Sequence, residues 1–119
     1  MKTVLIVDDE SSFRKAICAS LKARGYDTLE AEDGMMGLDI AAKHRPDIIL
    51  SDVNMDNMNG FMMVENLQQE PLTARIPIIM MTGQAQGAGA WQSEANITYL
   101  EKGFSIPELI TAIEGVLKK

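Results

Sequence analysis

Two apolar segments of the chain end in carboxylates. Val4–Val7 runs directly into Asp8 and Asp9. Ile48–Ser51 runs into Asp52. A buried strand tolerates an acid at its end only where something neutralises it, because an unpaired buried charge is very costly. If the two strands are parallel neighbours, the three acids converge at one edge of the sheet and favour a hard divalent cation held through oxygen, with Mg²⁺ the best match.

Three further residues follow expected strands at the same edge. Thr82 ends an apolar run with a hydroxyl, and Lys102 comes directly after Ile97–Glu101. Asn54 lies two residues beyond Asp52, in a loop where its backbone carbonyl can turn toward a metal. The acids, the Thr82 hydroxyl and Lys102 thus fall at the ends of separate strands. This places several polar and charged side chains at one crevice of the sheet.

The elements that position these residues alternate along the chain. Strands are expected at 3–7, 26–32, 48–52, 78–82 and 97–101. The first helix is expected to be capped by Ser11 or Ser12 and to stop at Gly25. Further helices are expected at 35–43, at 61–69 and after the capping box formed by Ser105 and Glu108. Repeated strand–helix units predict a parallel sheet with helices on both faces, joined by right-handed crossovers.

The segment Gly83–Ala90 predicts the weakest helix. It holds three glycines in eight residues, and each costs about 0.5–1 kcal/mol against alanine inside a helix. We expect a fourth helix only from about 88 to 95, short or poorly ordered.

Composition narrows the function classes. The 119 residues suit one domain, expected to span 1–119, and the net charge of −6 argues against nucleic acid or an anionic membrane as partner. No apolar run approaches the roughly 20 residues that span a bilayer. Cys18, the single cysteine, cannot form an internal disulfide, which predicts a cytoplasmic protein with a buried structural thiol. His44 is interpreted as a surface residue.

The ordered motifs resemble a known family. The sequence is similar to the response-regulator receiver domain, the CheY-like family of two-component signalling, over essentially all of its length. The resemblance is carried by Val4–Glu10, Asp52–Gly60, Thr82 and Tyr99–Lys102. It implies an α/β, flavodoxin-like (βα)5 fold with strand order 2-1-3-4-5.

The resemblance also implies a chemistry. Asp52 would be a carboxylate nucleophile that accepts a phosphoryl group from a histidine on a partner kinase. Asp9, Asp52 and the main-chain carbonyl of Asn54 would hold Mg²⁺, with Asp8 acting through a bound water. Lys102 would pair first with Asp52 and then with a phosphoryl oxygen, as electrostatic clamping.

Other residues would then read or time the modification. Thr82 would hydrogen-bond the phosphoryl group and draw its loop inward, which lets Tyr99 swing from exposed to buried. Asn54 and Gln84 flank the site and could tune the water that hydrolyses the acyl phosphate. The implied partners are a histidine kinase or histidine phosphotransfer protein and an unknown downstream protein. The domain would catalyse only its own phosphoryl transfer and dephosphorylation.

Three positions depart from the family pattern. Gly103 stands where proline usually follows the lysine, so the Lys102–Gly103 peptide is open to being cis or trans. Asp56 stands where the loop after Asp52 usually carries proline, and Gly83 stands where alanine is common.

Other classes remain as alternatives. A degenerate receiver would act as a phosphorylation-independent interaction module, and Gly103 with the glycine-rich segment keeps that hypothesis open. A magnesium-dependent phosphatase would need Asp-x-Asp after its first strand, where this chain has adjacent Asp8 and Asp9. A flavodoxin would need a loop rich in Ser, Thr and Gly there.

Overall fold

Five parallel strands form one sheet in the order β2-β1-β3-β4-β5. The computed structural model describes residues 2–53, 58–83 and 96–118. The elements are β1 (Thr3–Val7), α1 (Ser11–Ala23), β2 (Asp27–Ala31), α2 (Gly34–His44), β3 (Ile48–Asp52), α3 (Gly60–Gln69), β4 (Ile78–Thr82), β5 (Ile97–Glu101) and α4 (Ile106–Leu117). This is the predicted flavodoxin-like strand order, with four helices in the described residues.

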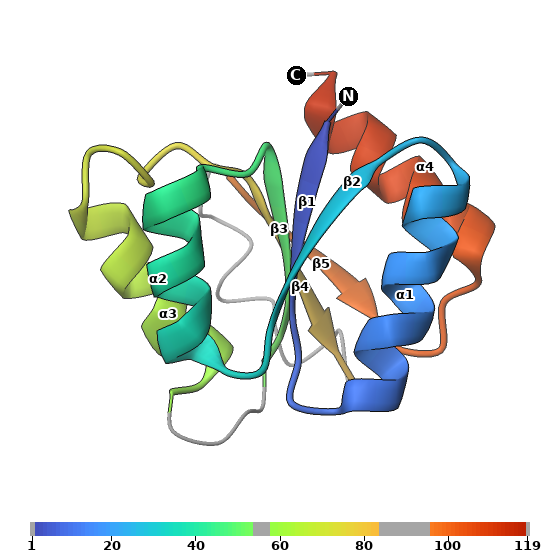
Figure 1. Ribbon diagram of the computed structural model, residues 1–119, viewed down its shortest axis with the longest axis horizontal. Coiled ribbons are helices and arrows are strands. Elements are labelled where there is room, and N and C mark those ends of the chain that lie inside the picture. The colour runs from blue at the N-terminus through green and yellow to red at the C-terminus, as the bar shows by residue number, and fades with distance from the viewer. Residues whose placement is uncertain (1, 54–57, 84–95, 119) are drawn as a thin grey trace.

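The helices cover both faces of the sheet, with α1 and α4 on one side and α2 and α3 on the other (Figure 1). Alternate strand residues therefore supply two separate cores. Val4 and Ile6 pack with α1 and α4, whereas Leu5 and Val7 pack with α2 and α3. β3 is buried along its whole length, as expected for a central parallel strand covered by helices on both faces. The edge strand β2 is mostly half-buried.

The helix starts follow local hydrogen bonds. Asp33 caps α2 and Asn59 caps α3 through side-chain oxygens. Ser105 and Glu108 form the predicted capping box of α4. Each cap satisfies backbone N–H groups that have no partner within the helix.

The predicted serine cap of α1 is wrong. Glu10 occupies the N-cap position and makes no side-chain cap hydrogen bond, and Ser11 and Ser12 are already helical. The cause lies in the preceding turn, where Asp8 Oδ1 accepts a hydrogen bond from the Glu10 N–H at 2.9 Å. That bond turns the chain early, so the helix begins before either serine can cap it.

The predicted strands 3–7, 48–52, 78–82 and 97–101 are confirmed at both ends, and α4 begins after its predicted cap. The edge strand β2 and the helices α1, α2 and α3 differ from the predicted bounds by one or two residues. The helix expected near 88–95 falls outside the described residues. Cys18 is buried as predicted, and burial raises the pKa of its thiol. No helix in the described ranges has the length and apolar character needed to cross a bilayer.

Two serine substitutions test the cap assignments. Ser105→Ala removes the side-chain acceptor for Glu108 N and should lower the free energy of unfolding by about 1 kcal/mol. Ser12→Ala replaces an exposed residue inside α1 and should leave stability unchanged or slightly raised. Urea denaturation measures both. A loss for Ser12→Ala as large as that for Ser105→Ala would contradict the assignment of Glu10 as the cap.

Candidate functional site

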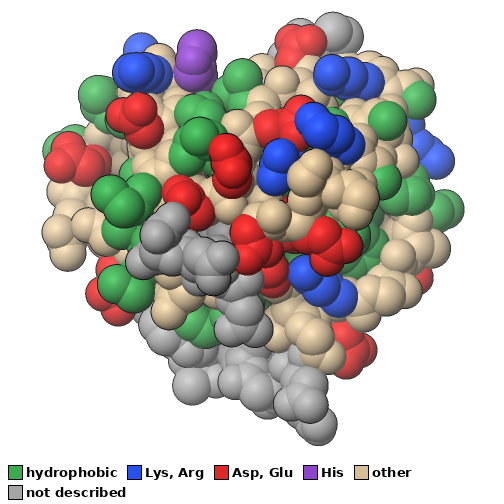
Figure 2. All heavy atoms as spheres, turned by 60° about the horizontal axis from the view of Figure 1, so that its bottom comes forward, with side chains coloured by type: hydrophobic (Ala, Val, Ile, Leu, Met, Phe, Trp, Pro, Cys, Tyr) green, Lys and Arg blue, Asp and Glu red, His purple; other side chains and the backbone are tan. Residues whose placement is uncertain are grey.

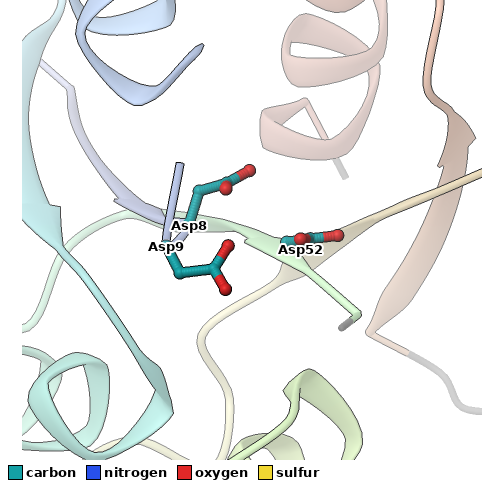
Figure 3. Close-up of side chains that lie close together, drawn as sticks. All are labelled: Asp8, Asp9 and Asp52. Carbon is teal, nitrogen blue, oxygen red and sulfur yellow. The ribbon is translucent and has the colours of Figure 1, made fainter. Parts of the chain in front are cut away.

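The strand register brings the two acidic segments together. Val7 pairs with Ser51 in the β1–β3 ladder, so the next residues, Asp8 and Asp52, lie side by side at the carboxyl ends of their strands. Figure 3 shows Asp8 and Asp9 at the end of β1 pointing toward the side on which Asp52 lies. The acidic cluster of Asp8, Asp9 and Asp52 is therefore a product of strand pairing between residues far apart in the chain.

The acidic cluster is compact enough to share one cation. Each acid offers a carboxylate oxygen, and these oxygens all lie within 4.8 Å of one another. Asp8 is fully buried and Asp52 is 8% exposed, whereas Asp9 is exposed. Within the described part of the chain, the buried Oδ2 of Asp8 has no hydrogen-bond donor. A hard cation satisfies such an oxygen set, so the cluster fits Mg²⁺. Figure 2 shows acidic side chains gathered on this face with basic ones beside them.

Lys102 reaches the acidic cluster from β5, two strands away from β3. Thr82 pairs with Glu101 in the β4–β5 ladder, and the Lys102 N–H donates to the Thr82 carbonyl at 2.6 Å. From that anchor, Lys102 Nζ lies 3.3 Å from Asp52 Oδ1 and 3.6 Å from Asp8 Oδ2. The second distance is an ion pair but too long for a hydrogen bond. The lysine side chain thus crosses the end of β4 to face both buried acids.

Burial and mutual charge shift the ionisation of this group. Burial raises the pKa of the Asp8 carboxyl, and the charges of Asp52 and Asp9 add to the shift, while the Glu10 N–H and Lys102 oppose it. Burial alone would lower the pKa of Lys102, but the charges of Asp52 and Asp8 outweigh it and hold that pKa above its ordinary value. The lysine is therefore a fixed positive charge at neutral pH.

The peptide bond after Lys102 is trans, as are all peptide bonds of the described residues. Gly103 adopts φ +100°, in the region that glycine enters without steric cost. The ring of proline fixes φ near −65°, so the family's usual residue cannot form this turn. A β-carbon at Gly103 would meet no atom within 4 Å. This position therefore favours glycine because of its positive φ and not because of a lack of space.

The remaining predicted site residues divide into two groups. Thr82 lies half-buried at the end of β4, and Tyr99 is half-buried in β5 with its hydroxyl oxygen enclosed. Asn54, Gln84 and Asp56 lie outside the described residues. The structure thus gathers Asp8, Asp9, Asp52 and Lys102, and the Thr82 carbonyl anchors the backbone of that lysine.

Arg14 is a site residue that the sequence analysis missed. It is 9% exposed, its Nη1 donates to the Asp8 carbonyl at 2.7 Å, and its Nε donates to Glu30 Oε1 at 2.8 Å. It therefore ties the acidic end of β1 to the edge strand β2. The available signal was its position: a basic residue near the start of a helix opposes the helix dipole, which indicates a partner elsewhere.

Gly60 allows the chain to pass close behind Asp52. A β-carbon at this position would lie 2.5 Å from the Asp52 carbonyl oxygen and 2.6 Å from Met80 Cε. The Gly60 N–H also donates to the Val53 carbonyl at 2.9 Å. The start of α3 thus packs directly on the backbone that carries Asp52.

Comparisons with known proteins agree with this arrangement. The sequence profile of the response regulator receiver domain matches residues 4–114. The chain is 35% identical to the phosphate regulon transcriptional regulatory protein PhoB of Pseudomonas aeruginosa, and the match covers 99% of this chain and 52% of PhoB. The chain thus spans about half the length of that relative. It is also 32% identical to protein PilH of the same organism, over 98% of each chain.

Solved structures give the same result. The chemotaxis response regulator CheY4 of Vibrio cholerae superposes with a TM-score of 0.90 at 32% identity, over 98% of each chain. A response regulator of Chloroflexus aurantiacus superposes with a TM-score of 0.89 at 30% identity. Sequence and backbone therefore select the same family.

A glycine pair tests how tightly Asp52 is packed. Gly60→Ala forces the backbone of Asp52 or the methyl group of Met80 to move, and should cost about 1–3 kcal/mol of unfolding free energy. Gly115→Ala is the matched control, because a β-carbon there meets no atom within 4 Å. This change within α4 should stabilise by about 0.5–1 kcal/mol. Equal effects of the two substitutions in chemical denaturation would contradict the close approach at Gly60.

The Arg14–Glu30 contact predicts a pH-dependent stability. The hydrogen bond from Arg14 lowers the pKa of Glu30, so the ionised carboxylate stabilises the fold. That contribution is fully present above the ordinary glutamate pKa of about 4.3 and is lost as pH falls through the lowered folded value. Glu30→Gln should therefore be less stable than the wild type at neutral pH, and the gap should close in acid.

Thermal melting from pH 7 downward measures that gap. Lys15→Met serves as the control, because Lys15 Nζ is exposed and lies 3.8 Å from Glu30 Oε1, an arrangement that contributes little. A stability gap between wild type and Glu30→Gln that stays constant to low pH would contradict the charged hydrogen bond.

Proposed function

This chain belongs to the response regulator receiver domain family of two-component signalling, and on that premise we propose that Asp52 accepts a phosphoryl group in a Mg²⁺-dependent reaction. The donor is a phosphorylated histidine on a kinase or on a phosphotransfer protein. The alternatives of an Asp-x-Asp phosphatase and a flavodoxin do not match this family. Residues 1–119 act in this proposal as one receiver domain.

One observation carries the proposal. Two buried carboxylates, Asp8 and Asp52, face one lysine, with Nζ 3.3 Å from Asp52 and 3.6 Å from Asp8. A purely structural ion pair needs one acid for one base. The surplus negative charge, increased by Asp9 at the same edge, suits a site that also receives a divalent cation.

The residues divide the chemistry between them. An oxygen of Asp52 attacks phosphorus, the N–P bond to the donor histidine breaks, and the imidazole nitrogen leaves with the electron pair. An anionic nucleophile approaching an anionic phosphoryl group needs its charge offset. Lys102 supplies one positive charge and can move from Asp52 to a phosphoryl oxygen. Asp8, Asp9 and Asp52 would hold Mg²⁺, which supplies further charge neutralisation and orientation when bound.

The acyl phosphate so formed is also the group that must be removed. In this separate hydrolysis step, water attacks phosphorus and loses a proton to solvent, the bond between phosphorus and the Asp52 oxygen breaks with its electron pair returning to the carboxylate, and inorganic phosphate leaves. Asn54 and Gln84 follow Asp52 and Thr82 by two residues each, and we assign them to tuning this hydrolysis. The chain's catalysis is then confined to its own modification and demodification.

The modified state is read through Thr82 and Tyr99 in this proposal. Thr82 ends β4 next to the site, and its carbonyl already accepts the Lys102 N–H. A hydrogen bond from the Thr82 hydroxyl to the phosphoryl group would shift the end of β4. Tyr99 lies on the neighbouring strand, paired with Met80, and responds to that shift. The output is a changed surface that a downstream protein recognises.

Phosphorylation by a small donor tests the proposal. Wild-type protein incubated with acetyl phosphate and Mg²⁺ should gain one acid-labile phosphoryl group by intact mass, and EDTA should abolish the gain. Asp52→Asn should gain none. Lys102→Met should react about 10²-fold more slowly, because it removes an electrostatic group at the transferring phosphoryl.

Asp39→Asn is the matched control for losing one carboxylate, because Asp39 is an exposed acid in α2 paired with Lys43 at 3.8 Å. It should react at the wild-type rate. A wild type that takes no phosphoryl group, and so matches Asp52→Asn, would favour the phosphorylation-independent interaction module instead. An Asp52→Asn variant that takes as much as the wild type would contradict Asp52 as the acceptor.

A further inference from the structure

Lys102 has an aromatic ring as well as two carboxylates beside it. Its Nζ lies 5.0 Å from the centroid of the Phe13 ring. Phe13 in turn meets Phe104 edge to face, with ring centroids 6.3 Å apart and an interplanar angle of 65°. The ammonium group is therefore bordered by anions and by the negative face of a π system.

This aromatic pair, Phe13 and Phe104, is anchored in the fold. Both rings are partly buried and pack against the core cluster between the sheet and helices α1 and α4. Phe13 belongs to the first turn of α1, and Phe104 follows β5 by three residues. The ring that faces Lys102 is thus held by a helix and by a second ring, and not by the lysine alone.

The turn at Gly103 makes the arrangement possible. Gly103 separates Lys102 from Phe104, and its φ of +100° redirects the chain between them. Both neighbours of this glycine contact the same Phe13 ring. Gly103, which replaces the family's usual proline, is therefore the turn residue that lets both Lys102 and Phe104 contact Phe13.

The aromatic pair restricts the position of the Lys102 ammonium group, which the ion pairs alone do not. The lysine ammonium is a compact charge on a flexible four-carbon stem, its side chain is 31% exposed, and Coulomb attraction has little directional preference. A ring face on one side restricts where the ammonium can sit while still attracting it. The result is a charge already placed where a phosphoryl oxygen would arrive.

We propose that Phe13, held in place by Phe104, is a positioning residue for Lys102 in the phosphoryl transfer to Asp52. The proposal rests on the proposed function above. It predicts that the electron density of the Phe13 ring, and not its bulk alone, contributes to the rate of phosphorylation. Phe13 touches neither Mg²⁺ nor the phosphoryl group in this role, and acts through Lys102.

The decisive variants change the ring face and keep its shape. Phe13→3,4,5-trifluorophenylalanine preserves packing but withdraws charge from the face, Phe13→Leu removes the ring, and Phe13→Tyr retains it. With acetyl phosphate and Mg²⁺, the trifluoro and leucine variants should be phosphorylated about three- to tenfold more slowly than wild type. The tyrosine variant should stay near the wild-type rate. Thermal melting of the trifluoro variant checks that the fold is intact.

A second background isolates the contact. In Lys102→Met protein, the trifluoro substitution should no longer change the phosphorylation rate, because the cation it acts on is gone. A structural role for Phe13 would give the same loss in both backgrounds. The NMR signals of the Lys102 Cε protons report the geometry without phosphorylation, and should show an upfield ring-current shift in wild type that Phe13→Leu abolishes.

The outcomes separate this proposal from the one it rests on. A wild type that takes no phosphoryl group overturns the proposed function and this role with it. A wild type that is phosphorylated at the same rate as the trifluoro variant overturns the role of Phe13 alone. Absence of the ring-current shift in wild type also overturns it.

Discussion

The structure depends on the neutralisation of two carboxylates at the ends of neighbouring buried strands. The β1–β3 register sets Asp8 beside Asp52, and both are buried. Burial and the neighbouring charge of Asp52 disfavour the ionised form of Asp8 and raise the pKa of its carboxyl. Lys102 provides the offsetting charge, 3.3 Å from Asp52 and 3.6 Å from Asp8. Because this lysine follows β5, the acids depend on the correct pairing of β4 and β5 as well as of β1 and β3.

The first turn of α1 supports that charge balance from the other side. The Glu10 N–H donates to Asp8, Arg14 donates to the Asp8 carbonyl and to Glu30, and the Phe13 ring lies against Lys102. The start of α1 thus contacts the Asp8 carboxylate, the Asp8 backbone and the Lys102 side chain. This explains why the chain enters α1 through a turn made by Asp8 and without a serine cap.

Apolar runs and their polar ends were sufficient to predict the strands. A fully buried parallel strand is a short continuous apolar segment, so β1, β3, β4 and β5 have the predicted limits. The convergence of Asp8, Asp9 and Asp52 also followed, because parallel strands end at the same edge. The helix termini were less predictable, because the start of α1 depends on the hydrogen bond from the Glu10 N–H to the Asp8 side chain.

The supporting contacts could not be predicted in the same way. Phe13 and Arg14 are consecutive residues of α1. Arg14 binds the Asp8 carbonyl and Glu30, whereas Phe13 contacts Phe104, which follows β5. Such partners depend on the packing of α1 against the sheet, which periodicity alone does not specify. Gly103 was recognised as a departure, but its φ of +100° is a property of the folded turn.

We propose that Asp52, among the three clustered acids, carries the phosphoryl group while Asp8 and Asp9 help to hold the cation. Reduction of the phosphorylated protein with borohydride, followed by peptide sequencing in a mass spectrometer, identifies the modified residue directly. We expect conversion of Asp52 alone, in a reaction that requires Mg²⁺. Modification of Asp8 or Asp9, or of no residue in protein incubated with Mg²⁺ and acetyl phosphate, would contradict it.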